Sequence, residues 1–168
     1  MNKALRGALD GVDTVSRWAI VACMAAMISV VSIQVFLRYV FADSLDWAEE
    51  ISRLTFVWAV FMAIPHGVRL AGHVGIDALA KHFPAALNAW LQRAIKLASA
   101  LLTGIVATQA AWAARDSWDQ LMPTVDLSSG WFYLAVTVGC AHSALHLVAQ
   151  ALGGPAAAPH PVTVEDAA

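Results

Sequence analysis

The sequence predicts an all-α integral membrane protein with four transmembrane helices, and three observations support this prediction. Of the 168 residues, 60% are apolar and only 13% are charged, about half the charged fraction of an ordinary soluble domain. The mean hydropathy is +0.64. Three long runs, residues 18–37, 97–114 and 127–164, contain no Asp, Glu, Lys or Arg. A chain of this composition would expose large apolar patches in water, which argues against a soluble globular enzyme.

The first predicted span covers residues 18–41. Its core from Trp18 to Leu37 has 20 uncharged residues, enough to cross about 30 Å of hydrocarbon as a helix. Lys3 and Arg6 precede this run as basic residues precede a signal peptide, but the run is longer than the apolar region of a cleaved signal. We therefore expect an uncleaved signal anchor.

The second predicted span covers residues 47–69 and is less regular. Its uncharged core, residues 54–68, has 15 residues and would cover only about 22 Å. The helix must therefore extend upstream into a charged segment. Arg53 follows Glu49 at i,i+4 and Glu50 at i,i+3, so these ions are expected to pair at the headgroup level. Pro65 is expected to bend the helix near its far end.

The third and fourth predicted spans cover residues 95–115 and 127–152. Between spans two and three, residues 74–94 place apolar side chains at helical spacing with polar ones on the opposite face, which predicts an amphipathic helical connection on the membrane surface. Residues 153–168 contain three prolines and many alanines and are predicted to form a disordered tail. Residues 1–152 therefore form one predicted four-helix transmembrane domain.

Basic residues predict the orientation of the chain. The N-terminus, the connection between spans two and three and the tail together carry seven Lys and Arg, against three in the other two connections. Lys and Arg concentrate on the cytoplasmic side of a membrane. Both termini and the amphipathic connection are therefore predicted to be cytoplasmic.

The sequence predicts no catalytic residue set, no metal site and no cofactor. It contains no Ser/His/Asp or Cys/His grouping with a shared site, no glycine-rich phosphate loop and no cysteine and histidine cluster at zinc spacing. A net charge of −2 provides no basic surface for nucleic acid. The spans also lack the mid-membrane charges that mark ion or substrate paths, which argues against a channel or transporter that acts alone.

Histidines leave one alternative open. His142 and His146 are spaced i,i+4 on span four, and His66 lies near the same end of span two. Because spans two and four run in the same direction, the three imidazoles are expected at similar depth, where two of them could ligate a haem. The alternative function is a haem-b-binding membrane anchor subunit of a redox enzyme. Interfacial or hydrogen-bonded histidines would give the same pattern.

Span three carries a row of small residues at helical spacing. Small side chains let two helix backbones approach closely, so this row is a candidate helix-packing face, either within the chain or with a partner. Its members are Ala100, Gly104, Thr108 and Ala111.

The two ends of span two carry motifs whose order resembles a known family. Span one ends in Arg-Tyr, span two begins with Trp-Ala-Glu-Glu-x-x-Arg, and Arg-x-x-x-His-x-x-x-Asp follows span two. In this order, in a four-span chain of this length, these motifs resemble the small membrane subunit, the DctQ-like component, of tripartite ATP-independent periplasmic (TRAP) transporters. The candidate subunit-interface or helix-end anchoring residues are Arg38, Trp47, Glu49, Glu50, Arg53, Arg69, His73 and Asp77.

The resemblance implies a role in secondary transport and not in catalysis. In such systems a periplasmic solute-binding protein delivers an organic anion, such as a C4-dicarboxylate or sialic acid, to a large multi-span permease subunit. An ion gradient, commonly of Na⁺, drives uptake, and the small subunit would be a scaffold and stabiliser of the large one. The implied partners are the large permease, the binding protein and membrane lipids, but no nucleic acid. The implied location is the bacterial inner membrane.

Overall fold

The computed structural model describes residues 3–43, 45–70 and 85–152 of the chain. These residues form four helices, each long and apolar enough to cross a membrane, and an isolated bridge between Leu121 and Ser128 is their only β-type pairing. The described residues therefore confirm the predicted all-α membrane fold. The helices are α1 (Lys3–Val40), α2 (Asp46–Leu70), α4 (Ala85–Asp116) and α5 (Gly130–Leu152).

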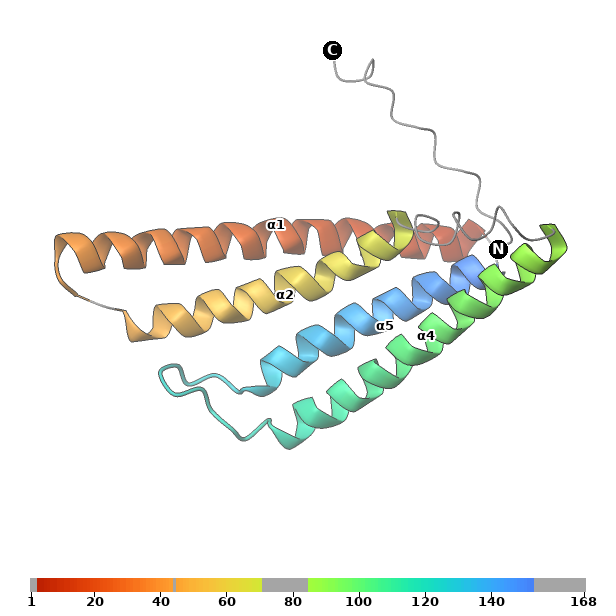
Figure 1. Ribbon diagram of the computed structural model, residues 1–168. Coiled ribbons are helices and arrows are strands. Elements are labelled where there is room, and N and C mark those ends of the chain that lie inside the picture. The colour runs from red at the N-terminus through yellow and green to blue at the C-terminus, as the bar shows by residue number, and fades with distance from the viewer. Residues whose placement is uncertain (1–2, 44, 71–84, 153–168) are drawn as a thin grey trace, which may run out of the picture.

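The helices lie side by side in a row and not in a closed bundle (Figure 1). Extensive packing joins α1 to α2, α2 to α5, and α5 to α4. The two ends of the row are taken along the helix axes. The α1–α2 turn and the α4–α5 connection lie at one end, and the start of α1 and the end of α5 lie at the other. Helix α5 is interior, with 39% of its most apolar segment buried, whereas the corresponding segment of the edge helix α1 is 0% buried.

Local sequence explains where the first two helices end and begin. Ala42 adopts a φ of 53°, a left-handed conformation that terminates a helix in the same way as a C-cap residue. Helix α2 then starts with Asp46 and Glu49 in its first turn, where carboxylates interact favourably with the positive end of the helix dipole. This helix continues through Pro65, whose side chain is fully buried.

Small residues allow α5 to occupy the interior of the row. The buried face of α5 includes Ala135, Gly139 and Ser143, which follow one another at i,i+4. At Gly139 the backbone of α2 approaches so closely that an added Cβ would lie 2.8 Å from the carbonyl carbon of Phe61. The aromatic rings of Trp58, at the middle of α2, and Trp131, at the start of α5, pack at a centroid distance of 6.4 Å.

Two helices begin earlier than the predicted spans. Helix α1 starts at Lys3, so the residues before the apolar run at Trp18 are also helical. Helix α4 starts at Ala85, so residues 85–94 of the predicted amphipathic connection are continuous with span three. The rest of that connection up to residue 84 and the predicted disordered tail lie outside the described residues. The membrane boundaries of the spans stay predictions.

A buried Asp–His–His cluster as candidate functional site

Asp13 lies on α1 and is only 3% exposed, although it precedes the apolar run. Ser16, one turn later on the same helix face, is equally buried and donates a hydrogen bond to the carbonyl oxygen of Met62 at 3.0 Å. Since residues spaced i,i+3 share a helix face, the pair fixes which side of α1 points to α2. The extended first part of α1 thus carries a carboxylate into the protein interior.

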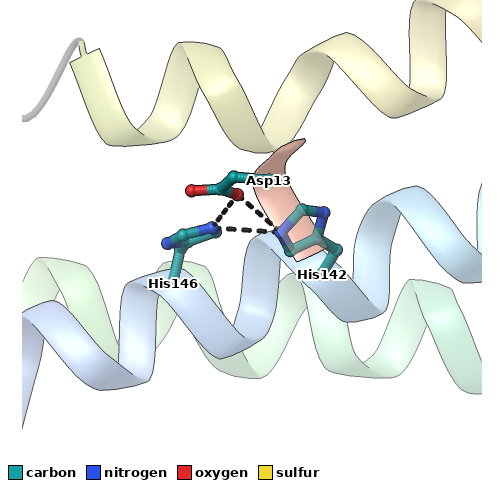
Figure 2. Close-up of side chains that lie close together, drawn as sticks. All are labelled: Asp13, His142 and His146. Atoms are coloured by element: carbon teal, nitrogen blue, oxygen red, sulfur yellow. Dashed lines mark hydrogen bonds and ion pairs between the residues drawn. The ribbon is translucent and has the colours of Figure 1, made fainter. Parts of the chain in front are cut away.

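Asp13 meets two histidines of α5 (Figure 2). The Nε2 atoms of His142 and His146 lie 2.9 and 2.8 Å from the same oxygen, Oδ1 of Asp13. The two Nε2 atoms are 3.1 Å apart. Because His142 and His146 are spaced i,i+4, both imidazoles project from one face of α5 towards the carboxylate. The result is a buried triangle of one oxygen and two nitrogens.

The second carboxylate oxygen of Asp13 binds α2. Oδ2 forms an ion pair with the guanidinium of Arg69, which also reaches Oδ1 of Asp10 at 3.1 Å. Gln150 of α5 adds a long hydrogen bond of 3.4 Å to the carbonyl oxygen of Val68. A buried charge that loses its partner costs about 3–5 kcal/mol, so this cluster ties α1, α2 and α5 together near the end of the row that carries the N-terminus.

His66 lies beside the cluster but does not join the triangle. Its ring is edge-on to that of His142, with a centroid distance of 6.5 Å. Its Nε2 atom is buried and has no hydrogen-bond partner among the described residues. Of the three histidines considered as haem ligands, two therefore point at Asp13 and the third adjoins them, so all three lie at similar depth.

The cluster at the start of α2 is divided between a local pair and a long-range contact. The guanidinium of Arg53 and the carboxylate of Glu49 pair at 2.6 Å with the i,i+4 spacing. Glu50 instead accepts a hydrogen bond from the backbone N–H of Thr124 at 3.2 Å, which fastens the α4–α5 connection to α2.

Among the other predicted interface residues, Arg38 and Trp47 are exposed. Arg69 belongs to the buried cluster, through its ion pair with Asp13. His73 and Asp77 lie outside the described residues.

Some members of the small-residue row of α4 are buried and others are exposed. Ala100 is buried, and Gly104 is partly exposed with nothing within 4 Å of an added Cβ. Thr108 and Ala111 are exposed. The small residues of α4 that are buried in this chain are Ala100, Ala107, Ala110 and Ala114.

The sequence pattern paired His142 with His146 but gave no sign of Asp13 as their partner. It marked Arg69 as a helix-end or interface residue, without its ion pair to Asp13. Asp13 lies 129 positions from His142, a separation that no local periodicity reports. One signal was present, because Asp13 and Ser16 are spaced i,i+3, as two polar residues on one helix face would be.

The four apolar helices and the polar groups that link them define the class of protein, a multi-pass membrane protein. Residues 27–154 match the sequence profile of a family described as "Tripartite ATP-independent periplasmic transporters, DctQ component". The chain belongs to this family. Its members are membrane subunits of transporters and not enzymes, as the motifs around span two predicted.

Individual relatives agree with this family. The chain is 25% identical over 138 residues to the sialic acid TRAP transporter small permease protein SiaQ of Vibrio cholerae, covering 82% of this chain and 78% of that protein. It is 33% identical over 76 residues to the C4-dicarboxylate TRAP transporter small permease protein DctQ of the same organism, covering 45% of this chain and 33% of that protein.

Two further DctQ proteins match shorter parts of their own length. The match to DctQ of Pseudomonas aeruginosa is 40% identical over 40 residues, 24% of this chain and 19% of that protein. The match to DctQ of Rhodobacter capsulatus is 30% identical over 112 residues, 66% of this chain and 49% of that protein. The chain thus spans half or less of the three DctQ relatives. None of these comparisons supports the haem-binding alternative.

Proposed function

We propose that this chain is the small permease subunit of a TRAP transporter and acts as scaffold and stabiliser of a large permease subunit. The transporter would import an organic anion, such as a C4-dicarboxylate or sialic acid, delivered by a periplasmic binding protein and driven by an ion gradient. The substrate classes are those in the names of the SiaQ and DctQ relatives. The chain would lie in the bacterial inner membrane with both termini in the cytoplasm.

The open row of helices carries this proposal. A chain that moved a solute alone would need a closed, polar interior, but the row leaves α1 and α4 as edges with broad apolar surfaces. Val21 and Ile28 of α1 are 54% and 57% exposed, and Leu101 and Trp112 of α4 are 66% and 61% exposed. Such surfaces can contact lipid or another membrane subunit. A large permease docked against one of them would be widened in the bilayer by this row of four helices.

A scaffold role also explains why the row is fastened at both ends. Glu50 binds the α4–α5 connection at one end, and Asp13 joins three helices at the other. A stationary support for a moving transport subunit needs a fixed spacing between its own helices. The polar contacts supply that rigidity without placing a charge in the middle of a span.

The first test of this function is co-purification followed by uptake. A tagged chain, extracted from its native host in mild detergent, should carry a large multi-span permease in a constant ratio. Deletion of the chain should abolish uptake of the substrate of that permease, measured with labelled C4-dicarboxylate and labelled sialic acid. Recovery of the chain alone, or of a coloured redox enzyme, would contradict the proposal.

Bulky substitutions on the two edges locate the partner. Ser32→Trp enlarges an exposed position of α1, and Thr108→Trp does the same on α4. The edge that docks the permease should lose about tenfold or more of the co-purified partner, because overpacking of about 1–3 kcal/mol destabilises a close helix contact. The other edge serves as the matched control. Full recovery with both variants would contradict docking through these edges.

A further inference from the structure

Asp13, His142 and His146 form a closed triangle of polar atoms, of which hydrogen bonds can bridge only two sides. Their three facing atoms are 2.8, 2.9 and 3.1 Å apart. In any protonation state, at most two hydrogens can bridge three such atoms, because an imidazole Nε2 either donates or accepts but does not do both. If both nitrogens donate to Asp13, the two donors face each other at 3.1 Å. If only one nitrogen donates, the other presents its lone pair to the carboxylate oxygen unless that oxygen is itself protonated.

We propose that this triangle is a binding site for a divalent transition-metal ion, with Zn²⁺ as the expected occupant. A cation satisfies all three atoms at once, because each presents a lone pair when the carboxylate is ionised and both Nε2 atoms are unprotonated. Two histidines spaced i,i+4 on one helix face are a recurrent pair of zinc ligands, and aspartate is a common third. The three candidate ligand atoms all lie within 4.8 Å of one another.

The dimensions fit a metal ion. Ligands about 2.0–2.1 Å from a tetrahedral zinc ion lie about 3.3 Å from one another. The observed separations of 2.8, 2.9 and 3.1 Å would have to expand by only a few tenths of an ångström. The three side chains are almost fully buried, with exposed side-chain fractions of 4% for Asp13, 6% for His142 and 8% for His146. Three protein ligands leave a fourth position open for water. The ring of His66 lies 6.5 Å from that of His142, and its buried Nε2 has no hydrogen-bond partner among the described residues.

The surroundings of the triangle also favour a cation. Arg69 binds Oδ2 of Asp13 and leaves Oδ1 directed at the two imidazoles (Figure 2), which is how outer contacts orient a metal-binding carboxylate. Asp10 contributes a second carboxylate to the same guanidinium. The two carboxylates and the one guanidinium carry a net charge of −1, which attracts a cation.

The expected role of the metal is structural. Among the described helices, α1 packs extensively on α2 alone, and α5 packs on α2 and α4. The triangle therefore joins the edge helix α1 directly to α5, across helices that share little other contact. A metal ion there would fasten α1 to the interior of the row. Soft or borderline divalent ions that favour imidazole, such as Co²⁺, Ni²⁺ and Cu²⁺, would compete for the same ligands.

Metal content of the full-length chain tests this inference. The chain, carrying an affinity tag without histidine and purified with any membrane partner that accompanies it, is grown with zinc, dialysed and measured for zinc by mass spectrometry. About one equivalent is expected. His146→Ala should retain less than about a tenth of that zinc. A His82→Ala/His160→Ala variant, which removes two other histidines of the chain and keeps Asp13, His142 and His146, should retain it all.

Two further measurements guard against a variant that fails to fold. Removal of zinc from the wild-type chain with a chelator should lower its unfolding midpoint, and added Zn²⁺ should restore it, by about 5 °C at a hundredfold excess over Kd. Asp13→His, which keeps a ligand at this position, should bind zinc, whereas Asp13→Asn should bind it at least tenfold more weakly.

Two outcomes would overturn the inference. One is the absence of zinc from the wild-type chain together with no response to added Zn²⁺. The other is equal zinc in the wild-type and His146→Ala chains. Either result would reduce the triangle to an ion-pair network, and neither depends on whether the chain belongs to a working transporter.

Discussion

Gly139→Ala should loosen the contact between α2 and α5. An added Cβ would lie 2.8 Å from the carbonyl carbon of Phe61 and 2.9 Å from its Cβ. Carbon atoms at optimal separation are about 3.5–4.0 Å apart. The two helices would therefore have to separate by about 1 Å. Overpacking of this kind lowers the free energy of unfolding by about 1–3 kcal/mol.

A second glycine of the chain provides a matched control. At Gly104 on α4, an added Cβ would meet nothing within 4 Å. Gly104→Ala gains the same helix propensity as Gly139→Ala, up to about 1 kcal/mol, without a clash. The difference in unfolding free energy between the two variants therefore isolates the steric cost at Gly139.

Thermal unfolding in detergent measures this difference. Tryptophan fluorescence is a convenient signal, because the chain contains seven Trp. We expect Gly139→Ala to unfold about 2–10 °C below Gly104→Ala. Helicity before heating, measured by circular dichroism, verifies that both variants have folded. An unfolding midpoint of Gly139→Ala equal to or above that of Gly104→Ala would refute the close approach of α2 and α5.

Two further predictions use charged pairs with internal controls. Asp13→Ala leaves two buried imidazoles without a hydrogen-bond partner and should lower the free energy of unfolding by about 2–6 kcal/mol, at about 1–3 kcal/mol for each. Asp10→Ala, at a carboxylate that is 63% exposed, should cost less than about 1 kcal/mol. Equal effects in thermal unfolding would argue against the buried cluster. Glu50→Ala removes the acceptor for the N–H of Thr124 and should increase hydrogen exchange and proteolysis in the α4–α5 connection, whereas Glu49→Ala, which breaks only an exposed local pair, should leave both unchanged.

Local rules in the sequence predicted part of the candidate site. The Glu49–Arg53 pair follows from i,i+4 spacing alone, and the structure confirms it. Spacing also placed His142 and His146 on one face of the last span. By contrast, Glu50 was expected to share Arg53 at i,i+3, but it binds Thr124 in a distant connection. Where a neighbour in the chain competes with a neighbour in space, spacing alone does not decide between them.

The rotation of each helix about its axis was the main unknown. In span three, the sequence did not show whether the row of small residues packs within the chain or against a partner. In the structure Thr108 and Ala111 are exposed, while Ala107 and Ala114 beside them are buried. This helix carries apolar residues on all of its faces, so hydrophobic periodicity gives little information about which face contacts protein and which contacts lipid. Only contact with α5 distinguishes the two sides.

The sequence by itself determined the all-α membrane class, the four helices and the family, because long uncharged runs and short ordered motifs are properties of neighbouring residues. The tertiary structure alone decided that the helices form a row, that Gly139 admits α2, and that Asp13 meets two histidines of α5. The physical reason is distance along the chain. Asp13 is 56 residues from Arg69 and 129 from His142, and such contacts exist only after helix packing has fixed which faces meet.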